Sequence, residues 1–137
     1  MRLPCQGAEL VKTFMPGSNL QAADLSQANL SEANIYGADL SGANLQGAEL
    51  VKTFMPGCKL QNADLSQANL LKANIDGSDL SGANLQGAKN LNLDQVMRAK
   101  NWEKAKYDED FRKKLNLKGS NCKCPIVPIA PLDETSK

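Results

Sequence analysis

Residues 23–45 have the sequence ADLSQANLSEANIYGADLSGANL. A large aliphatic residue stands at every fifth position, and a small residue stands two places before each one. This phase runs from Leu10 to Leu85, so sixteen consecutive fifth positions carry Leu, Ile or Met. Such a period matches neither the helical repeat of about 3.6 residues nor the strand repeat of about 2. Only a chain that turns in every unit points all these side chains inward, which predicts a solenoid.

A longer repeat fixes the number of units in one coil. Residues 7–46 and 47–86 differ at only seven positions, so a 40-residue block has been duplicated. The block contains eight units of five residues, which corresponds to two coils with four sides each. We therefore expect residues twenty positions apart to stack on one another, one coil above the next.

The units AADLS, QANLS, GADLS and GANLQ resemble the pentapeptide repeat family, whose motif is A-[DN]-L-x-x. The likeness covers residues 3–89. It implies an all-β solenoid, a right-handed, quadrilateral parallel β-helix of about four coils, with short C-terminal α-helices capping one end. We expect the large aliphatic side chains at the centres of the faces to form the core: Leu25, Leu30, Leu40, Leu45, Leu65 and Leu70.

The repeat ends near residue 90, and we divide the chain into a β-helix (1–90), a helical cap (91–117) and a flexible tail (118–137). Asn92 and Gln95 have the spacing of a helix-capping pair, and a second helix is predicted to begin near Asp108. The segment resembles the C-terminal helical cap of small cyanobacterial members of the family. We expect its apolar side chains to cover the last coil, with a ligand pocket as the alternative: Val96, Trp102, Tyr107, Phe111 and Leu115.

The composition argues against an enzyme. The chain has no histidine, and its 16 basic and 15 acidic residues give a formal charge of +1. The commonest general base and metal ligand is therefore missing. Cys122 and Cys124 supply two thiols where a zinc site needs about four ligands. We expect no catalytic, metal-binding or cofactor-binding residues, although a redox role of this cysteine pair, whose oxidation state the sequence does not settle, stays open.

One face of the predicted β-helix carries all the aromatic residues of the repeat. Phe14 and Phe54 point outward on it, and Tyr36 lies at the following corner. Contiguous exposed apolar surface often marks an interaction site. The alternative is that each phenylalanine packs over its own turn. The predicted partner surface consists of Val11, Phe14, Tyr36, Val51, Phe54 and Leu71.

These observations favour a non-enzymatic structural or protein-interaction module. The resemblance offers an alternative, since some relatives bind DNA gyrase as acidic mimics of DNA, but the near-neutral charge disfavours it. We expect a protein partner, which the sequence does not name, and neither nucleic acid nor membrane. The chain is expected to be a monomer or a weak homodimer that pairs through the N-terminal edge of the β-helix. We expect it in the cytoplasm, with export as the open alternative.

Overall fold

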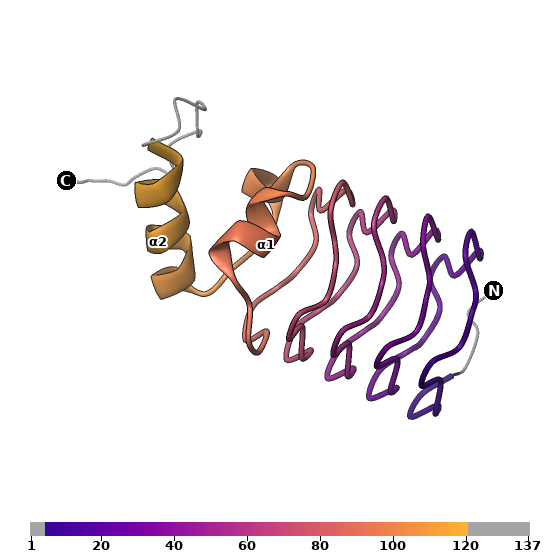
Figure 1. The fold of residues 1–137 in the computed structure, drawn as a ribbon. Coiled ribbons are helices and arrows are strands. Elements are labelled where there is room, and N and C mark those ends of the chain that lie inside the picture. The colour runs from indigo at the N-terminus through magenta and orange to yellow at the C-terminus, as the bar shows by residue number, and fades with distance from the viewer. Residues whose placement is uncertain (1–4, 121–137) are drawn as a thin grey trace. The chain divides into compact units, whose positions relative to one another are not determined.

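The computed structural model describes residues 5–120, with side chains as far as Asn116. Two compact units divide the chain, Met1–Tyr107 and Asp108–Lys137. In the first unit the chain winds into stacked coils of nearly constant cross-section (Figure 1). It is a right-handed, four-sided parallel β-helix of about four coils, as the resemblance to pentapeptide repeats implies.

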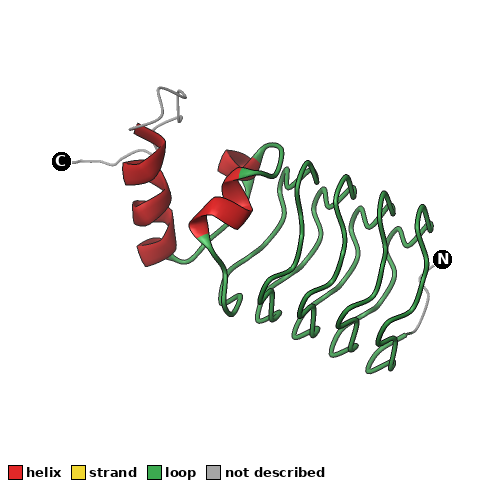
Figure 2. Ribbon diagram, in the orientation of Figure 1, coloured by secondary structure: helices red, strands yellow, loops and turns green. Residues whose placement is uncertain are grey.

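Each face of a coil contributes one bridging residue, and each bridge within the repeat, from Glu9 with Asn29 to Asn69 with Lys89, joins residues twenty positions apart. Asp24 pairs with Asn44, and Asn44 pairs with Asp64. The N–H of Leu25 donates to the carbonyl of Asn44 (2.7 Å), and the N–H of Asn44 donates to the carbonyl of Ala23 (2.8 Å). Because the chain turns again after so few residues, the coils are drawn as loops in Figure 2. The predicted stacking of residues twenty apart is confirmed.

A tight turn forms each corner. At most corners the N–H of the small residue donates to the carbonyl of the large residue three places earlier, as Ala43 does to Leu40 (2.9 Å). The third residue of the turn has a φ between 56° and 72° at every corner from residue 7 to residue 87. Positive φ at this place is the signature of a type II turn. Glycine occupies nine of these places, and residues other than glycine occupy the other eight.

The core is a column of aliphatic side chains at the centre of each face. All six predicted core leucines are at most 1% exposed. The first coil differs, because Leu10, Met15 and Leu20 are only half-buried there. Residues 1–4 precede this coil and lie outside the described residues, so pairing of two chains through the N-terminal edge stays a prediction.

Helix α1 (Leu93–Met97) lies over the end of the last coil (Figure 1). Asn92 caps it and forms the predicted capping box with Gln95. The Gln95 side chain also reaches the coil, where its Nε2 donates to the carbonyls of Leu70 (2.9 Å) and Ala73 (2.7 Å). The side-chain amide thus satisfies the Ala73 carbonyl, which the next coil would otherwise bond, and adds a second donor to the Leu70 carbonyl, which already accepts the N–H of Ala73.

The segment after α1 pairs with the β-helix through two backbone bridges, which the sequence does not predict. Lys100 pairs with Asp79, and Lys106 pairs with Asn84, as parallel bridges. Between them lies the 3-10 helix η1 (Trp102–Lys104). The leucine period has ended here, but the exposed edge of the last coil still needs backbone partners, and these two residues supply them.

The predicted cap residues belong to both units. Val96 is fully buried, and Tyr107, 6% exposed, donates its hydroxyl to the Trp102 carbonyl (2.6 Å). Phe111 and Leu115 lie in the second unit, on α2 (Glu109–Ser120). This helix begins one residue after Asp108, near which its start is predicted. Their role in covering the last coil stays a prediction. The rest of the predicted tail, with Cys122 and Cys124, lies outside the described residues.

Candidate interaction surface

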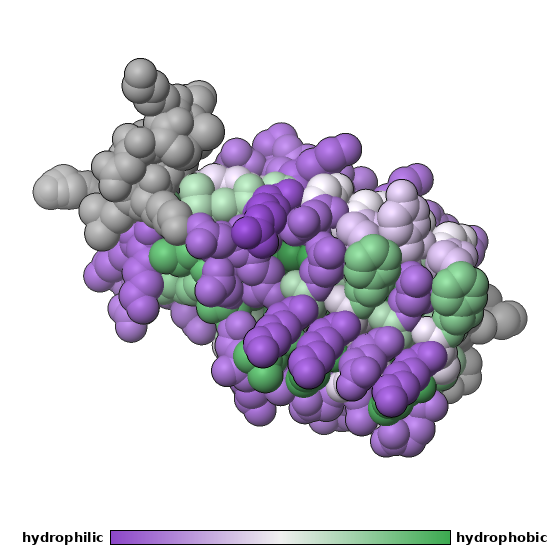
Figure 3. Space-filling model, in the orientation of Figure 1, coloured by the Kyte–Doolittle hydropathy of each residue, from purple (hydrophilic) through white to green (hydrophobic). Residues whose placement is uncertain are grey.

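The face with the aromatic residues is called here the aromatic face. Its outward column consists of Phe14, Asn34, Phe54 and Asn74, joined in that order by parallel bridges. The sequence places these residues together because they are twenty positions apart. Figure 3 shows two prominent hydrophobic side-chain groups on one side of the molecule, among mostly hydrophilic neighbours.

Proline explains how phenylalanine can occupy this column. At the asparagine positions, the side-chain oxygen accepts the N–H of the residue two places later, as Asn34 does from Tyr36 (3.1 Å). Phe14 and Phe54 have no such oxygen, but proline follows each of them two places later and has no N–H to satisfy. In the Phe-Met-Pro segments the outward residue therefore does not need to accept a turn N–H, and no backbone donor is left unpaired.

The exposed apolar residues of the first unit match five of the six predicted partner-surface positions. Phe14 is 77% exposed, Tyr36 56% and Phe54 41%. Val11 and Leu71 are exposed at the adjoining corner, whereas Val51 is half-buried. The Tyr36 and Phe54 rings stack with their centroids 6.1 Å apart. Phe54 thus packs against a residue of the preceding coil rather than only over its own turn, and most of the Phe14 surface is open to solvent.

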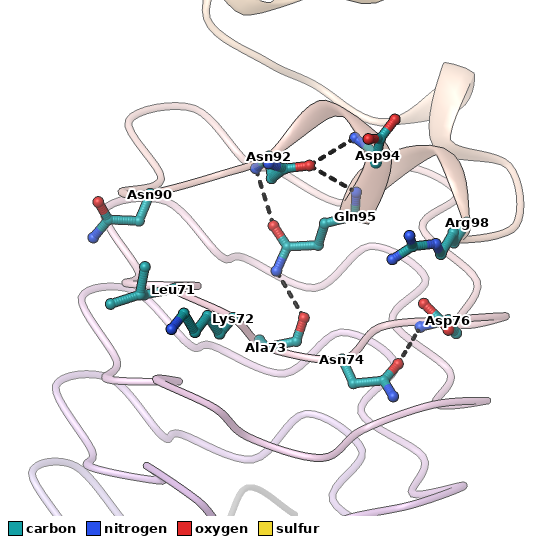
Figure 4. Close-up of a pocket in the computed structure, with 10 residues that line it drawn as sticks. All are labelled: Leu71, Lys72, Ala73, Asn74, Asp76, Asn90, Asn92, Asp94, Gln95 and Arg98. Atoms are coloured by element: carbon teal, nitrogen blue, oxygen red, sulfur yellow. Dashed lines mark hydrogen bonds between the residues drawn. The ribbon is translucent and has the colours of Figure 1, made fainter.

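A groove lies where the aromatic face meets α1, and sequence analysis did not find it. Its volume is about 560 Å³. One wall is the last strand of the aromatic face and the other is the α1 segment (Figure 4). Figure 4 shows Gln95 reaching down to Ala73 between the two walls. The lining residues are Leu71, Lys72, Ala73, Asn74, Asp76, Asn90, Asn92, Asp94, Gln95 and Arg98. Leu71 belongs to both the groove and the predicted partner surface.

Lysines gather at the corner beside the aromatic face. Lys12, Lys52 and Lys72 occupy the same turn position in three coils and are exposed, and we call them the lysine column. Glu32 occupies the remaining place in the column. Residues 5–89 contain only two further basic residues, Lys59 and Lys89. Comparing positions twenty apart in the sequence could have revealed this column.

The aspartates of the other faces serve the turns. Ser41 Oγ donates to Asp39 Oδ1 (2.7 Å), and Ser81 Oγ donates to Asp79 Oδ1 (2.8 Å). The hydrogen bond from Ser41 lowers the pKa of Asp39, and that from Asn101 lowers the pKa of Asp79. Both carboxylates are therefore stabilised in the ionised form, which suits turn acceptors better than acid catalysts.

The described thiols, like the turn aspartates, are better suited to a structural role than to a chemical one. Cys58 is buried and donates its Sγ–H to the Ile35 carbonyl (3.1 Å), and burial raises the pKa of its thiol to about 11. Cys5 is half-buried. Within residues 5–120, no three His, Cys, Asp or Glu side chains gather in a way that could hold a metal ion. In the same part of the chain, no helix is long and apolar enough to cross a membrane.

Comparison with known proteins identifies the family. A model of pentapeptide repeats matches residues 5–35, 18–57 and 56–87, with eight copies of the repeat. These matches cover more than half of the sequence, so the chain belongs to the pentapeptide repeat family. A comparison with curated proteins gave no match.

Two solved structures illustrate the likeness. A pentapeptide repeat protein from the thylakoid lumen of Arabidopsis thaliana is 29% identical, with a TM-score of 0.60, over 68% of this chain and 74% of that protein. A pentapeptide repeat protein from Nostoc is 32% identical, with a TM-score of 0.55, over 78% of this chain and 80% of that protein. Both support the β-helical fold.

Proposed function

We propose that this protein is a non-enzymatic module that binds another protein through its aromatic face. The observation that carries the proposal is the exposure of Phe14, 77%, on the face that also presents Tyr36 and Phe54. Aromatic side chains are enriched at the centres of protein interfaces because they bury a large apolar area with few rotatable bonds. A rigid β-helix holds them in place before binding, which reduces the entropy lost on association.

The distribution of polar groups supports a binding role over catalysis. The turn aspartates are committed to hydrogen bonds with neighbouring serines, and the Cys58 thiol is buried. Charge does not favour the alternative of a DNA mimic. Residues 5–89 carry five basic and eight acidic groups, and the lysine column lies directly beside the apolar surface. An acidic mimic needs a strongly negative face instead.

The proposal is tested by affinity capture from an extract of the native organism. The bait is the full chain, compared with the double variant Phe14→Ser/Phe54→Ser. The matched control is Gln46→Ser/Gln86→Ser, which changes two exposed residues of the opposite face. A protein captured by the wild type and the control, but not by the aromatic variant, supports the proposal. Equal capture by all three baits, or no specific capture, contradicts it.

A further inference from the structure

The charge beside the aromatic face constrains the kind of partner. Lys12, Lys52 and Lys72 form no ion pair with any described residue. The ion pair found among the described residues joins Lys113 and Glu109 on α2. Arg98 adds a fourth cation at the edge of the groove, whose lining also includes the acidic residues Asp76 and Asp94. Apolar surface flanked by unpaired cations complements a segment that carries both apolar and acidic side chains.

The groove adds two hydrogen-bond donors to this surface. In the coil beneath, the N–H of Lys52 donates to the Leu71 carbonyl (2.8 Å), and the N–H of Met55 donates to the Asn74 carbonyl (2.9 Å). The corresponding donors of the last coil are the N–H groups of Lys72 and Ile75. Within the described residues neither has an acceptor, because α1 stands where the next strand would be.

This gap is specific to the aromatic face. On the other three faces the last coil is continued by Lys89, Lys100 and Lys106, which accept from Leu70, Leu80 and Leu85 respectively. Backbone donors in a groove need acceptor oxygens. The backbone carbonyl groups of an extended segment supply such oxygens, as those of Leu71 and Asn74 do for the coil beneath.

We propose that the partner binds through an extended segment that is both apolar and acidic. This inference rests on the proposed function, since it names the chemistry of the partner for the same face. Apolar side chains of the segment cover Phe14, Tyr36 and Phe54, and its carboxylates pair with the lysine column. At the groove, oxygen atoms of the segment accept hydrogen bonds from the N–H groups of Lys72 and Ile75.

Selection from a random peptide library displayed on phage, with the full chain as target, tests the inference. The selected peptides are expected to combine aromatic or aliphatic residues with Asp and Glu. Reversing the charge of the lysine column with Lys12→Glu, Lys52→Glu and Lys72→Glu should weaken their binding about tenfold. The matched control, Lys89→Glu/Lys104→Glu/Lys106→Glu, changes three exposed lysines elsewhere in the first unit by the same charge and should bind nearly as well as the wild type.

The outcomes separate this inference from the proposed function. Neutral or basic peptides, or equal weakening by both triple variants, would overturn the acidic partner while leaving the aromatic face intact. Peptides that bind Phe14→Ser/Phe54→Ser as tightly as the wild type would overturn the proposed function itself, as would a selection without binders. NMR of the labelled chain examines the groove: addition of a selected peptide should shift the amide resonances of Lys72 and Ile75 and slow their hydrogen exchange. Unchanged amides would remove the groove from the binding site.

Discussion

The buried thiol of Cys58 shows how neighbouring coils determine the surroundings of a single side chain. Its column contains Ala38 one coil earlier and Ser78 one coil later, and the Ser78 hydroxyl accepts the N–H of Cys58 (3.0 Å). The side chain is 1% exposed, and burial raises its pKa from 9.0 to about 11. Cys58 stands at a small-residue position of the repeat, which places its side chain inward, whereas the size of the pKa shift follows only from the burial.

The Cys58 thiol should make stability depend on pH in alkaline solution. Its pKa is higher in the folded chain, so the folded state keeps a proton that the unfolded chain releases. The resulting stabilisation is complete below about pH 9 and is lost as the pH rises to about 11, by at most about 3 kcal/mol. Urea unfolding of the wild type and Cys58→Ala at several pH values measures it. Parallel curves for the two proteins would contradict the prediction.

The corners offer a second test, because their backbone conformation suits glycine. A Cβ at Gly37 would meet no atom within 4 Å, so Gly37→Ala changes only the conformational preference of the backbone. We expect it to destabilise the protein by about 1 kcal/mol. Ala22 has a φ of 56° at the equivalent place, so Ala22→Gly should be neutral or stabilising. Urea unfolding midpoints of the two variants decide this, and shifts in the same direction would count against the turn geometry.

The burial of a single residue can be predicted from the sequence where the five-residue period alone determines the direction of its side chain. The repeat places every core leucine correctly, because inward and outward positions recur every five residues. It does not predict that Tyr36 stacks on Phe54, since that contact joins a corner of one coil to the outward column of the next. Nor does a count of residue types reveal the lysine column, which becomes visible only when corner positions are aligned twenty apart.

Among the elements, α1 holds the end of the β-helix through Gln95. Gln95→Leu keeps a similar size but leaves the Ala73 carbonyl and the N–H of Asn92 without their side-chain partner, while the Leu70 carbonyl keeps only the N–H of Ala73 (3.1 Å). We expect a loss of about 1–3 kcal/mol in the free energy of unfolding. Gln95→Glu should cost more, because a carboxylate would then face two carbonyl oxygens. Thermal unfolding measures both effects.

The control for this prediction is Gln86→Leu, at an exposed glutamine of the first unit. It should leave the melting temperature nearly unchanged, because the Gln86 side chain is open to solvent. If Gln95→Leu melts at the same temperature as Gln86→Leu, the side chain of Gln95 does not hold α1 against the coil.

The sequence predicts α1 better than the segment that follows it. The Asn92 and Gln95 pair is a local signal, and the structure confirms its capping box. Lys100 and Lys106 carry no such signal, since they join the β-helix through backbone groups that any residue type provides. Their placement depends on the unpaired edge of the last coil and not on their own side chains. The groove follows from the same edge, which explains why pattern analysis does not find it.

In the first unit as a whole, the four faces of the β-helix share one core but present different outward residues. The core positions are nearly identical in all coils, while the outward positions differ from face to face. Aromatic residues gather on one face, lysines at its corner and most acidic residues on the other sides. Figure 3 shows, for one side of the molecule, hydrophobic groups bordered by hydrophilic side chains. The fold needs small and aliphatic inward residues and outward Asn or Asp acceptors at most turns, so the remaining outward positions, such as Phe14 and Phe54, are available for recognition.

The most direct test of a binding role for the aromatic face is the dissociation constant of the captured partner for three proteins, measured by titration calorimetry. They are the wild type, Phe14→Ser/Phe54→Ser and the control Gln46→Ser/Gln86→Ser. Loss of a hot spot worth about 2 kcal/mol predicts that the aromatic variant binds about thirtyfold more weakly, and the control should match the wild type. Equal dissociation constants for all three proteins would contradict the assignment of the aromatic face as the binding surface.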